Sequence, residues 1–373
     1  MEPTGTESGT DAAARTGTAL PGPRRASIIG AGLVGGSIGL ALRAQGWHVT
    51  GTDLDRAAEQ RAMTLGVIDT VGVDPAATIT FVAAPVRSIA VAVRQALAET
   101  AGAVTDVGSV KGSIVADVDH PRFVGGHPMA GSEQLGVEGA TPTLFEGAAW
   151  VLTPVAGTGS EHYATVSAVV RALGADVVAL DPARHDALVA VVSHVPHLTA
   201  AALMSIADER AEEHGALLRL AAGGFRDMTR IAAGTPTIWP DICDENREAI
   251  TDVIDRLIDE LGRLRSMITD GRRNDLLATL ERAQGARRNL PSRVVHPDEL
   301  AEVRIPVPDR DGVIAEVSTL ASGLGINIAD IEVAHSTEGD RGVLILLVDT
   351  AMADAFRAGL VTRGYRPAVS HLG

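Results

Sequence analysis

The sequence contains little cysteine and lysine, and it has no long uninterrupted apolar run. Cys243 is the only cysteine among 373 residues, which excludes an internal disulfide and a cysteine-rich zinc site. Lys111 is the only lysine among 32 lysine and arginine residues. No run reaches the roughly 18 consecutive apolar residues of a membrane span. Because apolar residues still make up 46% of the chain, we expect a soluble globular protein of two or three domains without a membrane partner.

Positive charge is also scarce. The 32 basic residues face 47 aspartate and glutamate residues, which gives a formal net charge of −15. This balance argues against binding nucleic acid or an anionic membrane surface. An anionic substrate would therefore need locally placed positive groups. Since no secretory signal is recognisable, the cytoplasm is the expected location.

The composition changes along the chain and predicts three domains behind a disordered tail. Residues 1–23 are rich in Thr, Gly, Ala and Pro and lack apolar periodicity, as disordered segments do. In residues 24–181 short apolar runs alternate with helical patterns, which indicates an α/β Rossmann domain with a doubly wound parallel sheet. The expected strands are 26–29, 47–52, 79–83, 103–107, 123–125, 149–153 and 177–180.

Residues 182–290 carry no strand pattern and predict an all-α domain. The clearest helix begins near Asn246 and ends near Gly271, with apolar residues at the i, i+3, i+4, i+7 spacing of one buried face. A stripe this long needs a large partner surface, either another subunit or helices of the same chain. Residues 289–297 have the composition of a linker. In residues 298–373 the expected order βαββαβ is that of a small α+β ferredoxin-like module.

A glycine motif follows the first expected strand. Residues 30–35 read GxGxxG and open a helical pattern. Glycine there permits a tight turn and close approach to a pyrophosphate, which the helix N-terminus binds. Asp53 ends the second strand, where an acid accepts hydrogen bonds from the ribose hydroxyls of NAD. We expect NAD as cofactor, although a flavin or nucleotide sugar uses the same fold and Arg56 complicates discrimination against NADP. The expected cofactor-binding residues are Gly30, Gly32, Leu33, Val34, Gly35 and Asp53.

Polar residues suited to catalysis gather in three places. DVGSVKG at 106–112 and GGHPMAGSE at 125–133 follow the fourth and fifth strands, at the edge where open α/β sheets bind ligands. The third cluster, in the helical part, combines SHVPH at 193–197 with GGFRDMTR at 223–230. Its histidines, His194 and His197, have no evident third ligand, so no metal site is expected.

His127, on a glycine-bounded loop, is a reasonable general base. Imidazole titrates near neutrality, and oxidation of a carbinol releases its hydroxyl proton. Ser109 could orient that imidazole, and Arg230 could bind a carboxylate through two hydrogen bonds. The residues alone leave other interpretations open: a helix cap for Ser109, a satisfied loop histidine for His127 and a structural ion pair for Arg230. Lys111 is either a solvated charge or a catalytic one.

Five strings identify a resemblance to a known family. They are GxGLxGGS at 30–37, DVGSVK at 106–111, GGHPMAGSE at 125–133, SHVPHL at 193–198 and GGFRDMTRIA at 223–232, and Trp239 follows. In order and spacing they resemble prephenate dehydrogenase over residues 26–290. The last module resembles an ACT domain through residues 308–313 and 325–328. The resemblance implies a homodimer that uses NAD to convert prephenate to 4-hydroxyphenylpyruvate for tyrosine synthesis.

The resemblance also implies roles for single residues. His127 would be the base at the ring hydroxyl, with Ser109 at the same hydroxyl. Removal of a hydride gives a dienone, and aromatisation then drives loss of the ring carboxylate as CO₂. Arg230 would hold a substrate carboxylate, Asp227 would steer Arg230, and Glu133 would lie at the pocket edge. The expected substrate-binding residues are Arg230, His197, Ser193, Glu133 and Asp227.

Three alternatives remain open on the sequence. Arogenate, or an amino analogue of prephenate, would use the same motifs. A β-hydroxyacid dehydrogenase has the same domain plan, but it generally uses a lysine in the helical part, where this chain has none. An amino-acid sensor with an inert dehydrogenase is the third, and the intact Ser109, His127 and Arg230 weigh against it. The ACT-like module would either bind tyrosine or another aromatic amino acid as inhibitor, or serve assembly only.

Overall fold

The computed structural model describes residues 23–131, 134, 136–213, 220–288, 300–308, 310, 312–335 and 341–371. Residues 1–22 of the predicted tail and the predicted linker at 289–297 lie outside the described residues. Contacts divide the chain into two compact units, residues 1–196 with 234–254 and residues 197–233 with 255–373. The domain boundaries expected at 181 and 290 stay predictions.

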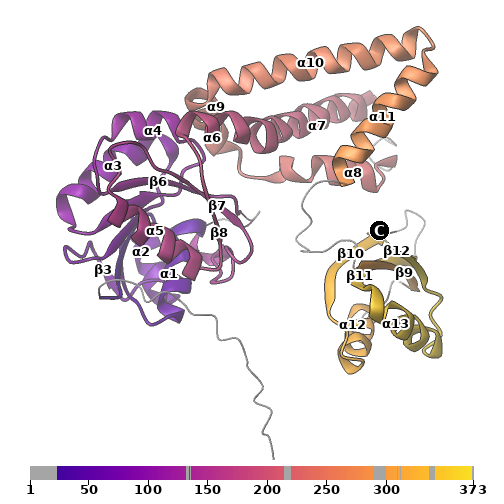
Figure 1. Cartoon of the computed structure of the whole chain (residues 1–373), viewed down its shortest axis with the longest axis horizontal. Coiled ribbons are helices and arrows are strands. Elements are labelled where there is room, and N and C mark those ends of the chain that lie inside the picture. Colours follow the sequence, from indigo (N-terminus) through magenta and orange to yellow (C-terminus); the bar gives the residue numbers. More distant parts are fainter. Residues whose placement is uncertain are drawn as a thin grey trace, which may run out of the picture. The chain divides into compact units, whose positions relative to one another are not determined.

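The first unit is built on an eight-stranded sheet (Figure 1). Its order is β3-β2-β1-β4-β5-β6-β7-β8, and the first six strands run parallel. Every predicted strand is present with small shifts of its ends, and the two-residue β3 is additional. The strands are β1 Arg25–Ile29, β2 His48–Thr52, β3 Thr70–Val71, β4 Ile79–Val82, β5 Ala103–Asp106, β6 Phe123–Pro128, β7 Ala149–Thr153 and β8 Asp176–Ala179.

The Rossmann fold class is confirmed, because β1 to β6 have the order 3-2-1-4-5-6. The predicted parallel arrangement holds for the first six strands and not for the last two. β7 pairs antiparallel with β6, and β8 runs parallel to β7. A parallel neighbour needs a crossover connection, usually a helix. Within the described part of residues 129–148 the only helical element is the short 3₁₀ turn Val137–Gly139, so the chain returns in the opposite direction.

Helices cover both faces of the sheet. Ile38 and Val169, from the first and fifth helices, belong to one buried apolar cluster. Ile89 and Ile114, from the third and fourth, belong to another. The sheet is therefore buried on both faces, as parallel sheets usually are. These helices are α1 Leu33–Ala44, α2 Arg56–Thr64, α3 Val86–Glu99, α4 Gly112–Asp117 and α5 Ser160–Ala172.

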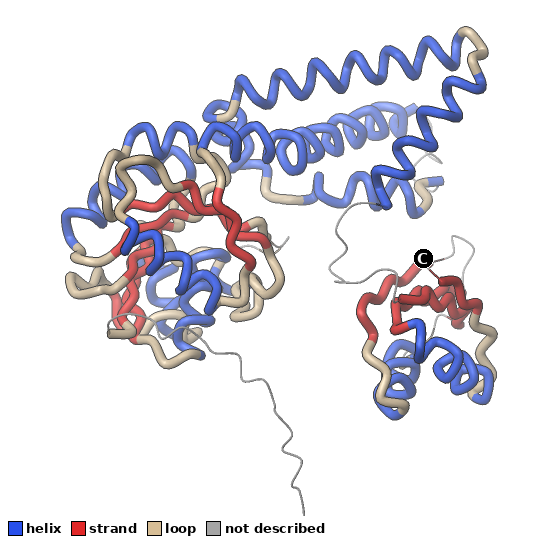
Figure 2. Tube along the Cα trace, viewed as in Figure 1, coloured by secondary structure: helices blue, strands red, loops and turns tan. Residues whose placement is uncertain are grey.

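The described residues between 182 and 288 contain helices and turns without strands, as predicted (Figure 2). A π-helical turn, Ala190–His194, separates α6 from α7. Pro196 follows it, and proline cannot supply the N–H of a regular α-helical bond. The predicted helix of residues 246–271 is confirmed as α10. The helices are α6 Pro182–Val189, α7 Val195–Glu213, α8 Gly223–Thr229, α9 Trp239–Glu245, α10 Arg247–Thr269 and α11 Arg273–Arg288.

One helical stretch of the described chain has the length and composition of a membrane span. Pro182–Ala211 contains 30 residues, its best window has a mean hydropathy of 1.6, and 33% of that window is buried. Arg184, Asp186 and His194 interrupt its apolar residues. It is therefore consistent with the expectation that no uninterrupted apolar run reaches the length of a membrane span. A core helix of a soluble protein passes the same test.

The C-terminal module, residues 300–371 as described, has the predicted order βαββαβ. Its four strands are antiparallel in the order β10-β11-β9-β12, which is the ferredoxin-like arrangement. Figure 2 shows the two helices on one face of this sheet, and their apolar sides form a core around Ile305, Val317 and Phe356. The elements are β9 Leu300–Pro308, α12 Val313–Gly323, β10 Ile328–His335, β11 Arg341–Asp349, α13 Thr350–Thr362 and β12 Ala368–His371.

Candidate active site

The turn between β1 and α1 has the shape that a dinucleotide requires. Gly30 has a φ of +99°, and a Cβ there would lie 2.3 Å from the Ala83 carbonyl oxygen. A Cβ on Gly35 would lie 1.9 Å from the carbonyl oxygen of Gly30. By contrast, a Cβ on Gly32 would meet nothing within 4 Å. Gly30 and Gly35 are thus required by the fold, and the space at Gly32 is left open in front of the α1 N-terminus.

The electrostatics of this turn suit a pyrophosphate and a ribose. The first turn of α1 contains no acidic side chain, so the positive end of the helix dipole can attract an anion. Asp53 directly follows β2, and its Oδ2 accepts the Ala31 N–H at 2.7 Å. Glu59 supports it, because the Glu59 Oε1 accepts the Asp53 N–H at 3.0 Å. The residues present therefore fit the adenosine half of NAD, with Gly32, Leu33 and Val34 around the helix start as predicted.

A buried ion pair lies at the end of β5. The side chains of Lys111 and Asp106 are both 0% exposed, and the Lys111 ammonium donates to Asp106 Oδ2. The Asp106 carboxylate also accepts the Gly108 N–H at 2.8 Å and the Gly126 N–H at 3.0 Å. Burial lowers the pKa of Lys111, and the Asp106 carboxylate opposes this shift. The alternative of a solvated Lys111 is wrong: the pair ties the β5–α4 loop to β6.

His127 lies within β6 and not on a loop, so that part of the prediction is wrong. Gly126 and His127 pair with Leu152 and Val151 of β7, and this pairing extends the strand beyond Gly125. His127 is 9% exposed. Burial, followed by the neighbouring His185 and positive charge, holds the pKa of His127 well below its ordinary value of 6.5. The imidazole is therefore neutral near pH 7 and available to accept a proton.

The partner of the His127 ring is His185. The two rings meet edge to face with centroids 5.1 Å apart, and His127 Nδ1 lies 2.8 Å from His185 Nε2. His185 Nδ1 lies 2.8 Å from Asp186 Oδ1. Asp186 in turn accepts the backbone N–H of Lys111 at 2.8 Å and of Gly112 at 2.7 Å. A hydrogen-bonded chain thus runs from β6 through α6 to the start of α4.

A second buried histidine, His194, is held by Asn246. The Asn246 side-chain amide donates to the Asp186 carbonyl oxygen at 2.9 Å, and the same nitrogen lies 3.1 Å from His194 Nδ1. His194 Nδ1 is therefore the acceptor, and the proton of the neutral ring resides on Nε2. That buried Nε2 has no hydrogen-bond partner among the described residues. Burial lowers the pKa of His194 to about 4.

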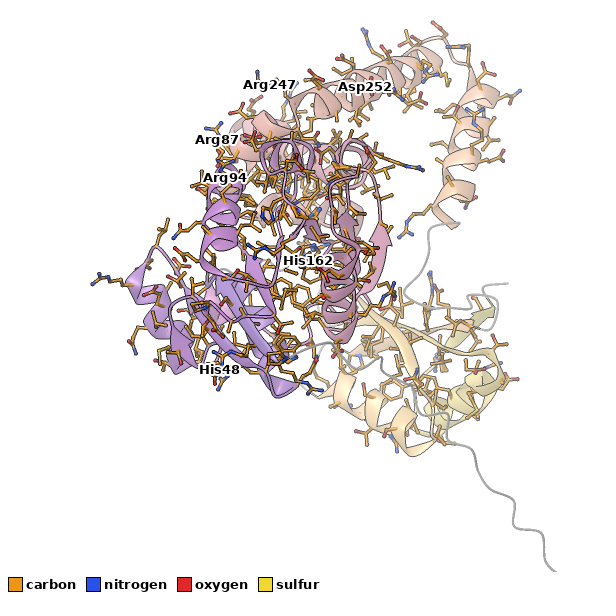
Figure 3. The ribbon with its side chains drawn as sticks, turned by 60° about the vertical axis from the view of Figure 1, so that its left-hand side comes forward. His48, Arg87, Arg94, His162, Arg247 and Asp252 are labelled. Atoms are coloured by element: carbon orange, nitrogen blue, oxygen red, sulfur yellow. The ribbon has the colours of Figure 1, made fainter. Side chains whose placement is uncertain are left out.

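Charged surface residues hold α9, whose last residue, Glu245, directly precedes Asn246. Arg87 of α3 pairs with Asp241 at 3.0 Å and also with Asp244. Arg247 binds the other oxygen of Asp244 at 2.8 Å. Figure 3 labels Arg87 and Arg247, which come from α3 and from the start of α10. These pairs fasten α9 to the sheet domain and so hold Asn246 beside His194.

The structure distributes the other predicted residues as follows. Ser109 lies half-buried between β5 and α4, and among the described residues its hydroxyl makes no hydrogen bond, so the predicted Ser109–imidazole contact is replaced by His185. Ser193 lies in the π-helical turn of the first unit. His197 on α7, Asp227 on α8 and Arg230 directly after α8 belong to the second unit, and the last two are exposed. Glu133 lies outside the described residues.

The sequence interpretation missed His185, Asp186 and Asn246. The only signal was a His-Asp pair one turn into a helix that begins with the cap Asp181 and Pro182. Such a pair is common on exposed helices. Its role becomes visible only when the structure places it against β6.

Comparison with known proteins identifies the family of this chain. The nucleotide-binding domain of prephenate dehydrogenase matches residues 38–179, and the dimerization domain matches residues 181–282. Prephenate dehydrogenase of Bacillus subtilis (strain 168) is 34% identical over 334 residues, which cover 85% of this chain and 90% of that protein.

Solved structures show the same likeness. Prephenate dehydrogenase from A. aeolicus, in complex with hydroxyphenyl propionate and NAD⁺, is 32% identical with a TM-score of 0.67, covering 71% of this chain and 98% of that one. Arogenate dehydrogenase of Synechocystis is 29% identical with a TM-score of 0.61, covering 70% and 98%. With the GxGxxG turn, Asp53 and the buried His127 in place, this chain belongs to the prephenate dehydrogenase family of NAD-dependent oxidoreductases.

Proposed function

We propose that the substrate is prephenate, which the enzyme oxidises and decarboxylates to 4-hydroxyphenylpyruvate in tyrosine synthesis. The observation that carries the proposal is His127, a buried histidine kept neutral by a pKa well below 6.5. Bound NAD supplies a hydride acceptor. His127 takes the proton of the ring hydroxyl, so that the carbinol can become a ketone, and the electron-accepting ketone then allows CO₂ to leave.

Further residues are proposed to bind the substrate. Ser109 contacts the same hydroxyl as His127. Arg230, steered by Asp227, holds a carboxylate through its planar guanidinium. A local cation is needed because the net charge of −15 repels an anion. The further substrate-binding residues are His197, Ser193 and Glu133.

The enzyme is proposed to be a cytoplasmic homodimer. The matched dimerization domain supports the assembly, and exposed Ile258, Leu261 and Ile268 on α10 supply apolar surface for it. A single cysteine suits a reducing compartment. We also propose that the C-terminal module binds tyrosine or another aromatic amino acid and lowers turnover. Its ferredoxin-like topology supports the comparison with ACT domains.

The test is NADH formation with NAD and prephenate, followed spectroscopically, for the wild type and His127→Ala. General-base catalysis contributes about 10²–10⁴-fold, so kcat should fall by that order while the KM for NAD stays unchanged. His162→Ala, at the residue of α5 labelled in Figure 3, is the matched control and should keep full activity. Turnover of arogenate and not of prephenate would show that arogenate is the substrate. The similarity to the arogenate dehydrogenase of Synechocystis is the reason for testing it. Inactivity on both would reject the proposal.

A further inference from the structure

In the series of hydrogen bonds from His127 through His185 to Asp186, the donor of each bond can be assigned. The assignment starts from Asp186. Both oxygens of Asp186 accept backbone N–H groups, from Lys111 at 2.8 Å and Gly112 at 2.7 Å. These amides stand at the N-terminus of α4. Amide donors favour the ionised carboxylate, which can only accept hydrogen bonds. The contact of 2.8 Å between Asp186 Oδ1 and His185 Nδ1 is therefore donated by His185.

This assignment determines the state of both rings. A neutral His185 that carries its proton on Nδ1 has a lone pair on Nε2. At 2.8 Å from His127 Nδ1, that lone pair accepts a hydrogen bond from a protonated Nδ1. The proton of neutral His127 is then on Nδ1, and its Nε2 is bare. With the opposite polarity, His127 would carry its proton on Nε2 and could not act as a base there.

We propose that His185 and Asp186 are positioning residues that fix the tautomer of His127, so that Nε2 is the proton acceptor. This rests on the proposed function of His127 as base. In the reaction the substrate O–H bond breaks and an N–H bond forms at Nε2. His127 then carries a proton on each nitrogen, and the chain through His185 to the Asp186 carboxylate stabilises the positive charge. His185 itself neither gains nor loses a proton.

The burial of His185 and Asp186 strengthens their effect on the tautomer of His127. His185 is 0% exposed and Asp186 is 8% exposed, so bulk water is largely kept from replacing either partner. A hydrogen bond in such surroundings is stronger than in water, and an unmatched one costs more. The tautomer with Nε2 protonated would bring two lone pairs together at 2.8 Å. It is disfavoured for that reason.

Two substitutions separate the two functions of the His185 ring. In His185→Gln the terminal amide reaches the former place of Nε2 and offers an oxygen to His127. In His185→Asn the shorter amide reaches only the place of Nδ1, beside Asp186. With the full-length enzyme, NAD and prephenate, we expect Asn to lower kcat about 10²-fold with little change in either KM. Gln should restore kcat to within about tenfold of wild type.

A control shows whether any loss of a histidine has the same effect. His48 on β2, labelled in Figure 3, pairs with Asp69 at 3.5 Å and is half-exposed. His48→Asn should leave kcat unchanged. Equal loss of kcat in the Gln and Asn variants of His185 would overturn the proposal, because a purely structural role predicts no rescue by the longer amide.

A second measurement does not depend on turnover. Histidine labelled with ¹⁵N, with the His127 signals assigned by their loss in His127→Gln, reports which nitrogen carries the proton. Between pH 6.5 and 8 we expect wild-type His127 to be protonated on Nδ1, and His185→Asn to show a mixture. Protonation on Nε2 in the wild type overturns the tautomer proposal whether or not prephenate is a substrate. The expected tautomer in an enzyme inactive on prephenate and arogenate would reject only the proposed function.

Discussion

The region around His127 at the edge of the large sheet and the C-terminal module are both built from a sheet covered by helices. They differ in where their charged side chains lie. At the sheet edge Lys111, Asp106 and Asp186 are buried, and each is paired. In the described residues of the module the buried side chains are apolar apart from the Tyr365 hydroxyl. The ion pairs in the described part of the module are more exposed: Arg310 and Glu316 are 54% and 37% exposed, and Arg304 and Glu302 are 57% and 20% exposed.

The difference shows what each region can do. Removing charges from water costs several kcal/mol per ion, and groups with displaced pKa values gather where chemistry needs them. At the sheet edge, charged groups are buried despite this cost, and they hold His127 as a neutral base. The described core of the module contains no buried charge. We therefore expect an effector of the module to bind through exposed side chains and backbone groups. Four experiments test this comparison.

The largest effect is expected from Lys111→Met. This change leaves the Asp106 carboxylate buried without its counter-charge, which should lower the free energy of unfolding by about 3–5 kcal/mol. Tryptophan fluorescence in urea measures it, since Trp47, Trp150 and Trp239 all belong to the first unit. The matched change Arg310→Met, followed by hydrogen exchange of the module, should cost less than about 1 kcal/mol. Similar losses at the two sites would remove the contrast.

Acid should weaken the sheet edge through His194. Its pKa of about 4 in the folded protein lies below the ordinary 6.5, so the unfolded chain binds a proton more readily in that interval. Neutral His194 therefore contributes fully to the free energy of unfolding above pH 6.5. This contribution, about 3 kcal/mol, is lost as the pH falls from 6.5 towards 4. Urea unfolding at a series of pH values measures it. His194→Gln should flatten the profile; an unchanged slope in the variant would show that other groups are responsible.

A smaller effect is expected from Gly32→Ala. The new Cβ meets no protein atom within 4 Å, so the free energy of unfolding should stay nearly constant. NAD affinity should fall about tenfold, or ~1.4 kcal/mol, because the methyl group occupies space in front of the α1 N-terminus. Calorimetric titration with NAD measures it. Gly35→Ala is the contrasting variant and should destabilise the fold itself; if Gly32→Ala binds NAD normally, the pyrophosphate lies elsewhere.

The smallest effect on turnover is expected from deleting residues 297–373. Because every residue proposed for catalysis or substrate binding precedes residue 297, kcat with prephenate should stay the same. Inhibition by tyrosine should disappear. Both are measured in one assay at increasing tyrosine concentration, with the full-length chain as control. Inhibition that persists in the truncated enzyme would assign the effector to the catalytic region.

The features that depend on residues close together in the chain could be predicted from the sequence. The GxGxxG turn with Asp53, the helix α10 and the order βαββαβ follow from local periodicity and from glycine's conformational freedom. The motif order was specific enough to indicate the family and its cofactor. His127 was also singled out as a candidate base, although its strand was assigned to a loop and its burial was not predicted.

Tertiary structure alone decided how the base is held. His127 and His185 are 58 residues apart in sequence, and Lys111 and Asp186 are 75 apart. No local pattern relates them, because the contacts arise when α6 packs against the end of β6 and the start of α4. The direction of β7, the burial of Lys111 and the tautomer of His127 have the same origin. Each depends on which surfaces exclude water, and that is settled only when distant segments come together.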